Sequence, residues 1–404
     1  MLGTGPKFPL NYSGMTIRYE EAIERARSIV PLAKKNVQLA EEMRRIPEEN
    51  AKAILDSGLM PLMRPKMFGG FEADWMTQID CVSEVAQYCG STGWVMTFFL
   101  QHQFFLSLFP LEAQRYVYEH QKDPTILTSF FQTGSAKEVP GGYEVGGRWH
   151  FGSGGDYCSW AILGGVIRNP DGSVKKRLNF LLKPDQFKID RVWDAIGLRG
   201  SGSNDIVVEP TFVPESFVYD HDLAMIGKAP GHSVHEGVLY RTPLVLNSGF
   251  AVMTPMHGIA RGCYNAFVEL TSARAARPMG ARPADRVETQ IAIGESGAEI
   301  DLAYLITEKL TATIFRGGKV TRADAVRQRR DMMMVLKLIQ RGVDRLFDLS
   351  GTHGLLGNHA IQRHWRDIHA IGHHAQWQAP ALQTAGRDEL GLPPLSGDTY
   401  PLDS

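Results

Sequence analysis

Histidine is the residue whose number and spacing first indicate chemistry in this sequence. The chain has 13 histidines, and they are dense between His353 and His374. His369 and His373 are four residues apart, one turn of a helix, with Asp367 close by, and this spacing can hold a metal. We expect no metal site, because no second cluster offers the remaining ligands at a recognisable spacing. A hydrogen-bonded structural role suits most of these histidines, whereas one enclosed in an apolar pocket suits acid–base work near neutral pH.

Two single residues in the first half of the chain can also be interpreted either as structural or as catalytic. His102 lies within the very apolar segment Trp94–Phe109, where its default role is that of a core histidine with satisfied hydrogen bonds. Ser153 follows a predicted strand in a glycine-flanked turn, where it would by default be a turn former. Neither residue is assigned to catalysis by its position alone.

Aromatic and basic residues mark two further candidate positions. Trp149 and Phe151 alternate with polar residues, as on one buried face of a strand. Arg274 and Arg277 end a predicted helix, where arginines are most often solvated but can also hold a phosphate bidentately.

Several common sites are excluded by spacing. Gly200-Ser-Gly202 lacks the third glycine of a dinucleotide-binding loop and lies between predicted strands, and Gly152-Ser-Gly154-Gly155 fails for the same reason. No GxSxG, HExxH, Walker or kinase signature occurs. The cysteines form no CxxC pair, which argues against a zinc ribbon, a thioredoxin-type motif or a disulfide scaffold; they are Cys81, Cys89, Cys158 and Cys263.

The composition is that of a globular enzyme without a charged partner. The 404 residues are 43% hydrophobic, and 43 basic against 44 acidic residues give a formal net charge of −1. We therefore expect no nucleic-acid and no anionic-membrane partner. The start, MLGTGPKFPLN, does not resemble a signal peptide, and apolar runs such as Trp94–Leu100 are too short to cross a bilayer. These features predict a cytoplasmic protein.

The periodicity predicts three successive domains: residues 1–122 helical, 123–232 β and 233–404 helical. Pro31 should break the first helix, Pro47 should be the first residue of the next, and further helices are expected over 77–88 and 92–108. Short β-branched or aromatic runs separated by turns predict a small antiparallel barrel or sandwich over 143–213, with Pro210 at an edge or a bulge. Long helices are expected over 255–276, 287–315, 322–350 and 360–376, the third ending before Gly351.

The order of these segments and several strings together resemble the acyl-CoA dehydrogenase fold. Gly147-Arg-Trp-His-Phe-Gly-Ser153-Gly resembles that family's flavin-contacting strand and turn. Ile196-Gly-Leu-Arg-Gly-Ser-Gly-Ser203, followed by Phe212-Val-Pro-Glu, resembles its next signature, and Trp365-Arg-Asp367 its late arginine–aspartate motif. The resemblance covers about residues 20 to 390. It implies a mostly helical protein with a central β domain.

One departure from the dehydrogenases concerns the catalytic base. Many of them carry a glutamate shortly after the arginine–aspartate motif, whereas residues 368–376 contain no carboxylate. The sequence is closer to the two-component flavin-dependent monooxygenases of this fold, which include p-hydroxyphenylacetate, secosteroid-phenol and dibenzothiophene monooxygenases. Cys89-Gly-Ser-Thr-Gly-Trp94 with His102 resembles their N-terminal signature, and Trp365-Arg-Asp-Ile-His369 with His374 their C-terminal one.

This resemblance implies the oxygenase component of a two-component system. Reduced flavin (FMNH2 or FADH2) would come by diffusion from a separate NAD(P)H-dependent reductase and react with O2 to a flavin C(4a)-hydroperoxide. That species would hydroxylate a small aromatic, phenolic substrate in a site that excludes water. The resemblance also implies a homotetramer.

It further implies roles for the candidate residues. Ser153 would bond near flavin N5, His102 would lie on the peroxide side of the ring, and His374 would take the phenol proton. Trp94, His369 and His373 would contact substrate, His369 also orienting the arginine–aspartate motif. The flavin contacts would be Trp149, Phe151, Arg274, Arg277 and, from a neighbouring subunit, Thr352.

Three alternatives stay open at this stage. The same scaffold could oxygenate sulfur or an amine nitrogen, for which a base matters less. It could be an acyl-CoA dehydrogenase with a displaced base, or a flavin-binding protein without catalytic activity.

Overall fold

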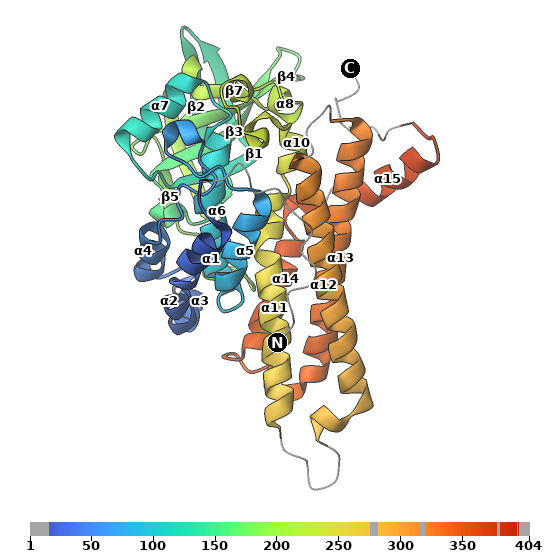
Figure 1. Ribbon diagram of the computed structural model, residues 1–404. Coiled ribbons are helices and arrows are strands. Elements are labelled where there is room, and N and C mark those ends of the chain that lie inside the picture. Colours follow the sequence, from blue (N-terminus) through green and yellow to red (C-terminus); the bar gives the residue numbers. More distant parts are fainter. Residues whose placement is uncertain (1–15, 275–281, 316–319, 378–379, 394, 396–404) are drawn as a thin grey trace.

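The computed structural model describes residues 16–274, 282–315, 320–377, 380–393 and 395. Helices come first, a β-sheet follows, and long helices end the chain, in the predicted order (Figure 1). Of the helices in these ranges, none combines the length and the apolarity that crossing a membrane requires.

The first helices are short and follow the proline signals with small shifts. Pro31 lies in the first turn of a second helix rather than ending the first, because proline fits a position where no amide partner is needed. Pro47 precedes its helix as the capping residue and is not its first residue. The elements are α1 (Tyr19–Arg27), α2 (Val30–Lys35), α3 (Val37–Met43), α4 (Glu48–Asp56) and, after the next pair, α7 (Leu111–His120).

Two helices, α5 (Trp75–Ala86) and α6 (Gly90–Leu106), form a buried hairpin. Asp74 caps the first, since its side chain accepts a 2.7 Å hydrogen bond from Thr77 N. Every residue of α6 is buried, as its apolar character on all faces predicts. Such a helix can form one wall of a site that excludes water.

The central strands form one sheet of mixed direction, so the purely antiparallel prediction is wrong. Neighbours follow the order β5-β6-β2-β1-β3-β4-β7, and β1 runs parallel to β3. Strand β1 was not predicted, because its second half carries glycine and polar residues. Pro210 lies at a register shift between β6 and β2, which confirms the predicted bulge. The strands are β1 (Ile126–Val139), β2 (Gly142–Gly152), β3 (Trp160–Arg168), β4 (Val174–Leu182), β5 (Lys188–Asp190), β6 (Asn204–Pro214) and β7 (Val218–Asp220).

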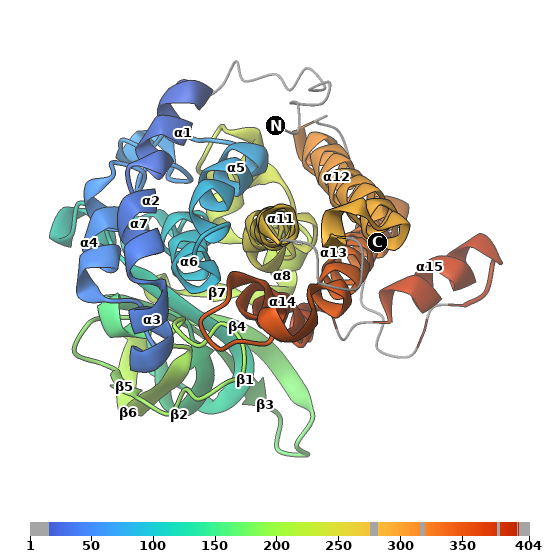
Figure 2. The ribbon, with the colours of Figure 1, turned by 90° about the horizontal axis from the view of Figure 1, so that it is seen from below.

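The C-terminal helices pack around α11 (Phe250–Ala273). In Figure 2 this helix lies between the α5–α6 hairpin on one side and α12 (Val287–Phe315) and α13 (Arg322–Gly354) on the other. The long helix is interrupted at Gly351, whose φ of 63° is not helical, which agrees with the predicted end before this glycine; a short further helical stretch runs to Gly354. The remaining helices are α8 (His221–Met225), α9 (Val238–Arg241), α10 (Leu244–Asn247), α14 (Ala360–Gly372) and α15 (Ala381–Glu389), of which α14 alone was predicted.

The core continues from the N-terminal helices into the C-terminal ones. The Trp75 ring of α5 stacks on Phe250 of α11 with centroids 5.1 Å apart. Its indole nitrogen donates a 2.8 Å hydrogen bond to Asn247 Oδ1. The two helical parts are therefore joined by a shared interior rather than by a flexible linker.

Candidate active site

A cavity of about 690 Å³ lies where α6, the β domain and the end of α14 meet. Its volume suits a small-molecule site. Most of the lining surface is apolar, although about half of the lining residues also carry a polar group. The lining residues are Trp94, Phe98, His102, Thr128, Ser129, Phe130, Phe151, Ser153, Trp193, Leu198, Ser203, Arg329, Ala370, His373, His374, Ala375 and Gln376.

Helix α6 presents one face to this cavity. Trp94, Phe98 and His102 are spaced by four residues, so they lie on the same side of the helix. The rings of Trp94 and Phe98 are 5.0 Å apart, and those of Phe98 and His102 are 5.1 Å apart. The apolar wall predicted from the sequence therefore ends in an imidazole.

His102 is a neutral imidazole with a defined tautomer. Its Nδ1 donates to the carbonyl of Ile126, and its Nε2 lies 3.2 Å from Thr128 Oγ1. Burial lowers the pKa of His102 to about 4, against the Ile126 bond, which raises it. With the proton on Nδ1, the Nε2 nitrogen is left as an acceptor at the cavity wall.

Ser153 lies beside Trp94 of α6, in the turn that follows β2. The turn is tight: Phe151 has φ 68°, unusual for a residue with a side chain, and a Cβ on Gly154 would come within 2.9 Å of Val95. Ser153 Oγ accepts a 3.0 Å hydrogen bond from Trp94 Nε1. It also lies 2.7 Å from Ser203 Oγ.

A third serine extends this contact into a chain. Ser201 Oγ is 2.7 Å from Ser203 Oγ, so three hydroxyls and one indole are linked. The two serine–serine bonds use two of the three hydroxyl hydrogens. If Ser201 donates to Ser203 and Ser203 to Ser153, the remaining hydrogen is Ser153's, and it can be donated into the cavity.

His374 has the opposite tautomer. Its Nδ1 accepts a 3.1 Å hydrogen bond from the backbone amide of Gln376, so a neutral ring carries its proton on Nε2. Burial lowers the pKa of His374 to about 4. The ring stands edge-on to Trp94 with centroids 6.3 Å apart. His374 is thus a hydrogen-bond donor through Nε2.

Two residues expected at the site lie elsewhere. Trp149 is fully buried inside the β domain, where its indole donates a 2.7 Å hydrogen bond to Gly164 O, and it does not line the cavity. Phe151, 54% exposed, is the aromatic residue of this strand at the cavity. His369 does not line the cavity either, because its Nε2 is bound to Asp344 at 2.7 Å and its ring lies against Trp365.

Two of the expected flavin contacts outside the β domain, Arg274 and Thr352, are also separate from the cavity. Arg274 follows the last residue of α11, where its charge lowers the pKa of His359, and Thr352 is exposed beside Gly351. Neither lines the cavity of this chain. Arg277 lies outside the described residues.

Several lining residues were not predicted from the sequence. Trp193 and Leu198 lie between β5 and β6, in and beside a segment that only its resemblance to a family motif had marked. Thr128 belongs to the unpredicted strand β1. Arg329 and Gln376 lie on helical stretches where no local pattern separates a lining residue from a solvated one.

The residues present fit a flavin ring. Gly154, which follows Ser153, lets the turn approach α6 closely, and the Ser153 hydroxyl is placed to meet a polar ring atom. Phe151 and Trp193 stand edge-to-face with centroids 6.4 Å apart beside it. An aromatic lining with a few hydroxyls suits a planar heterocycle.

Comparison with known proteins also indicates a flavin-binding protein. A family model, "Acyl-CoA dehydrogenase, C-terminal domain", matches residues 250–379. The chain is 33% identical to the oxygenase subunit HsaA of a flavin-dependent monooxygenase from Rhodococcus jostii, over 92% of this chain and 98% of that one. It is 28% identical to the oxygenase component of an FADH2-dependent resorcinol hydroxylase from Rhizobium sp., over 92% and 94%.

A solved structure extends the likeness to three dimensions. XiaF from Streptomyces sp., in complex with FADH2 and glycerol, matches with a TM-score of 0.85 and 25% identity, over 93% of this chain and 96% of that one. The predicted acyl-CoA dehydrogenase-like fold and the reduced-flavin cofactor are thereby confirmed, and a two-component system implies a flavin reductase as partner. The chain belongs to the two-component flavin-dependent monooxygenases of the acyl-CoA dehydrogenase fold, as an oxygenase component.

Proposed function

We propose that this oxygenase hydroxylates a phenol. The observation that carries the proposal is the pair of neutral histidines with opposite polarity in one apolar cavity: His102 Nε2 accepts and His374 Nε2 donates. A phenol needs both, since its hydroxyl must lose a proton and its oxygen must then be stabilised.

Bound reduced flavin would supply the two electrons that activate O2, so that one oxygen atom enters the ring and the other leaves as water. The chain's own part is to exclude water and to place hydrogen bonds. Trp94 and Phe98 close one side of the cavity, and the Ser153 hydroxyl, held by Trp94 and Ser203, faces the position that the flavin ring fits.

His102 would take the phenol proton. A phenol has a pKa of about 10 and is therefore protonated and weakly nucleophilic at neutral pH. A neutral imidazole whose Nε2 is already an acceptor can draw off that proton, an effect typically worth roughly 10²–10⁴-fold in rate. The Thr128 hydroxyl, whose Oγ1 lies 3.2 Å from Nε2, would rotate when the phenol binds, either away from the histidine or toward the substrate oxygen.

His374 would act as a donor instead. Its bond from Gln376 N keeps Nδ1 occupied, so His374 could serve as a base only after that bond breaks. The hydrogen bonds therefore favour the reverse of the roles implied by resemblance. In this assignment His374 Nε2 donates to an oxygen that gains negative charge, and His373 lines the cavity beside it.

The lining argues against the alternatives. Among the described lining residues Arg329 is the one arginine or lysine, and none is an aspartate or glutamate. A cationic amine would find no carboxylate to pair with among these lining residues, which disfavours N-oxygenation. The same lining holds no carboxylate to remove an α-proton, which disfavours acyl-CoA dehydrogenation. Sulfur oxygenation of a neutral heteroaromatic remains the second candidate.

We further propose that the chain assembles as a homotetramer. Helix α12 exposes large apolar side chains, with Val287 65% and Ile291 54% accessible, which fits burial against another copy. Thr352, expected to meet a neighbour's flavin, and Arg274 are then tested by substitution in the assembled protein. Sedimentation of the purified chain reports its assembly directly.

Product analysis tests the function. The protein is mixed anaerobically with reduced FAD or FMN, then with O2 and one of three probes: resorcinol, an aryl methyl thioether or a dialkylaniline. We expect a hydroxylated product from resorcinol. Sulfoxide as the main product would favour the second candidate, and hydrogen peroxide alone with all three would contradict both.

A further inference from the structure

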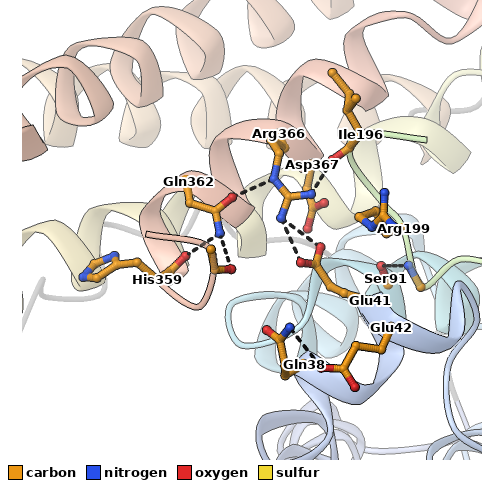
Figure 3. A network of polar contacts seen from close by, with 12 residues as sticks. Gln38, Glu41, Glu42, Ser91, Ile196, Arg199, His359, Gln362, Arg366 and Asp367 are labelled. Carbon is orange, nitrogen blue, oxygen red and sulfur yellow. Dashed lines mark hydrogen bonds and ion pairs between the residues drawn. The ribbon is translucent and has the colours of Figure 1, made fainter. Parts of the chain in front are cut away.

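Two adjacent residues of α14, Arg366 and Asp367, lie where the three parts of the chain meet (Figure 3). Neither lines the cavity. Both contact the connection between β5 and β6, which we call the wall segment, residues 193–203. This segment supplies Trp193, Leu198 and Ser203 to the cavity lining.

Asp367 binds the middle of the wall segment. Its side chain is 1% exposed, and Oδ1 accepts a 2.6 Å hydrogen bond from the backbone amide of Leu198. Its Oδ2 lies against Gly90, the first residue of α6, where an ideal Cβ would be only 2.4 Å away. A carboxylate at this end of α6 is favoured by the helix dipole. Asp367 therefore joins α14, the wall segment and the cavity helix.

Arg366 binds the same segment two residues earlier and connects it to the N-terminal helices. Its Nη1 donates to the carbonyl of Ile196, and its Nη2 contacts both carboxylate oxygens of Glu41 on α3, at 2.8 and 3.0 Å (Figure 3). Its Nε donates to Gln362 Oε1 at 2.7 Å, which fixes the side chain on its own helix. Charge-assisted bonds of this kind hold geometry well.

The wall segment passes too closely for side chains at two places. A Cβ on Gly197 would lie 2.1 Å from the carbonyl oxygen of Arg366, and one on Gly200 would lie 2.9 Å from Ala40. Gly200 N also donates a 3.0 Å hydrogen bond to Ser91 Oγ of α6. Between the two glycines, Leu198 has φ 49°, a conformation that a residue with a side chain adopts only when its surroundings impose it.

Two other residues of the wall segment are hydrogen-bonded to the strained Leu198. The carbonyl of Leu198 accepts hydrogen bonds from Trp193 Nε1 at 3.1 Å and from Ser201 N at 2.9 Å. Ser201 belongs to the hydroxyl chain that ends at Ser153. The amide of Leu198 and its carbonyl thus link Asp367 to both the aromatic and the hydroxyl side of the cavity.

We propose that Arg366 and Asp367 are positioning residues that hold the wall segment in its strained conformation and thereby set the place of Trp193 and Ser203 in the cavity. The effect on coupling rests on the proposed function, whereas the effect on the wall segment does not. Without the two side chains Leu198 relaxes, the serine chain loses its alignment, and water enters the cavity.

Amide hydrogen exchange of the full chain, read by mass spectrometry, tests the positioning itself. Asp367→Ala and Arg366→Gln are compared with wild type, and Asp367→Asn is the conservative variant, since its amide oxygen can still accept from Leu198. Asp344→Asn is the matched control, because Asp344 also binds α14 residues, Trp365 and His369, but does not contact the wall segment. Peptides over 193–203 should exchange roughly tenfold faster in the first two variants.

The pattern of exchange separates positioning from general damage. We expect α11 and α13 to keep their protection, Asp367→Asn to fall between Asp367→Ala and wild type, and Asp344→Asn to match wild type over 193–203. If Asp367→Ala does not fold, Arg366→Gln and Asp367→Asn carry the test. Unchanged exchange of 193–203 in those variants, or a rise spread equally over the whole chain, would overturn the inference.

A second readout connects the segment to turnover. The ratio of hydrogen peroxide to hydroxylated resorcinol should rise several-fold in Arg366→Gln, with a larger change in kcat than in KM. A wild-type protein that gives no hydroxylated product contradicts the proposed function but leaves the exchange result to decide the inference.

Discussion

Ser203 lies 2.7 Å from Ser153, hydroxyl to hydroxyl, and this contact decides where the Ser153 hydrogen can point. Trp94 donates to Ser153 from the other side, so Ser153 has one accepted bond fixed by the indole. A second bond accepted from Ser203 would leave its own hydrogen for the cavity.

Removal of the Ser203 hydroxyl should therefore impair coupling without removing Ser153. In Ser203→Ala we expect the ratio of hydrogen peroxide to hydroxylated product to rise roughly 3- to 10-fold, the worth of one hydrogen bond. Ser153→Ala should raise it further. Ser173→Ala, in an exposed turn, is the control, and the outcome is read by quantifying both products. An unchanged ratio in Ser203→Ala would show that the chain does not orient Ser153.

The two histidines should respond differently to the acidity of the substrate. In His102→Asn, hydroxylation of a phenol that is protonated at the working pH should fall roughly 10²–10⁴-fold, because the proton acceptor is lost. A more acidic phenol, ionised before it binds, should recover most of that loss. His374→Asn should lose activity with both phenols to a similar extent. Recovery in the His374 variant and not in the His102 variant would return the base role to His374.

The buried His102 should make the protein less stable as the pH becomes acidic. Burial lowers the pKa of this histidine from 6.5 to about 4, so the folded state prefers the neutral ring. The corresponding stability is fully present above pH 6.5 and is lost as pH falls through about 4. Urea unfolding of wild type and His102→Asn should therefore converge between pH 6 and 4, where the wild type loses up to about 1.4 kcal/mol per pH unit from this group.

Asp367 should make the unfolding free energy change with pH in the opposite direction. Burial raises the pKa of this carboxyl to about 7, against the Leu198 amide, which lowers it; Glu41 raises it, and Arg366 and Arg363 lower it. The folded state thus holds the proton more tightly than the unfolded chain, and stability falls as pH rises from 4 to 7. We expect the unfolding free energy of wild type to decrease relative to Asp367→Asn over that range. A constant difference would show that Asp367 is ionised throughout.

The sequence was sufficient for the longest helices, for several strands and for part of the site. Periodicity located α6 and the long C-terminal helices, because an apolar helix and long amphipathic ones leave clear patterns. It did not locate β1, whose glycine and polar residues weaken the strand pattern. It also could not show that β1 and β3 run parallel, since pairing direction depends on partners distant in the chain.

Within the site, prediction from the sequence was limited because the contacts join residues that are far apart in the chain. His102, Ser153 and His374 line the cavity as expected, and the resemblance to a family rather than any local spacing had singled them out. Trp149 and Phe151 were indistinguishable in the sequence, because strand alternation does not say where a strand ends; the left-handed Phe151 reverses the expected direction at that point. The tautomers of His102 and His374 depend on the carbonyl of Ile126 and the amide of Gln376, which no pattern reports.

The complete burial of α6 couples substrate range to folding. Trp94, Phe98 and His102 form the cavity wall, while the other faces of the same helix pack into the interior of the protein. A substitution that widens the cavity from this side also removes packing from the core, at a cost of several kcal/mol for an aromatic residue changed to alanine. New substrates are therefore admitted at lower cost through residues 373–376, which are half-buried or exposed. Relatives that act on different aromatic compounds should diverge in this segment while the residue sizes along α6 stay constant.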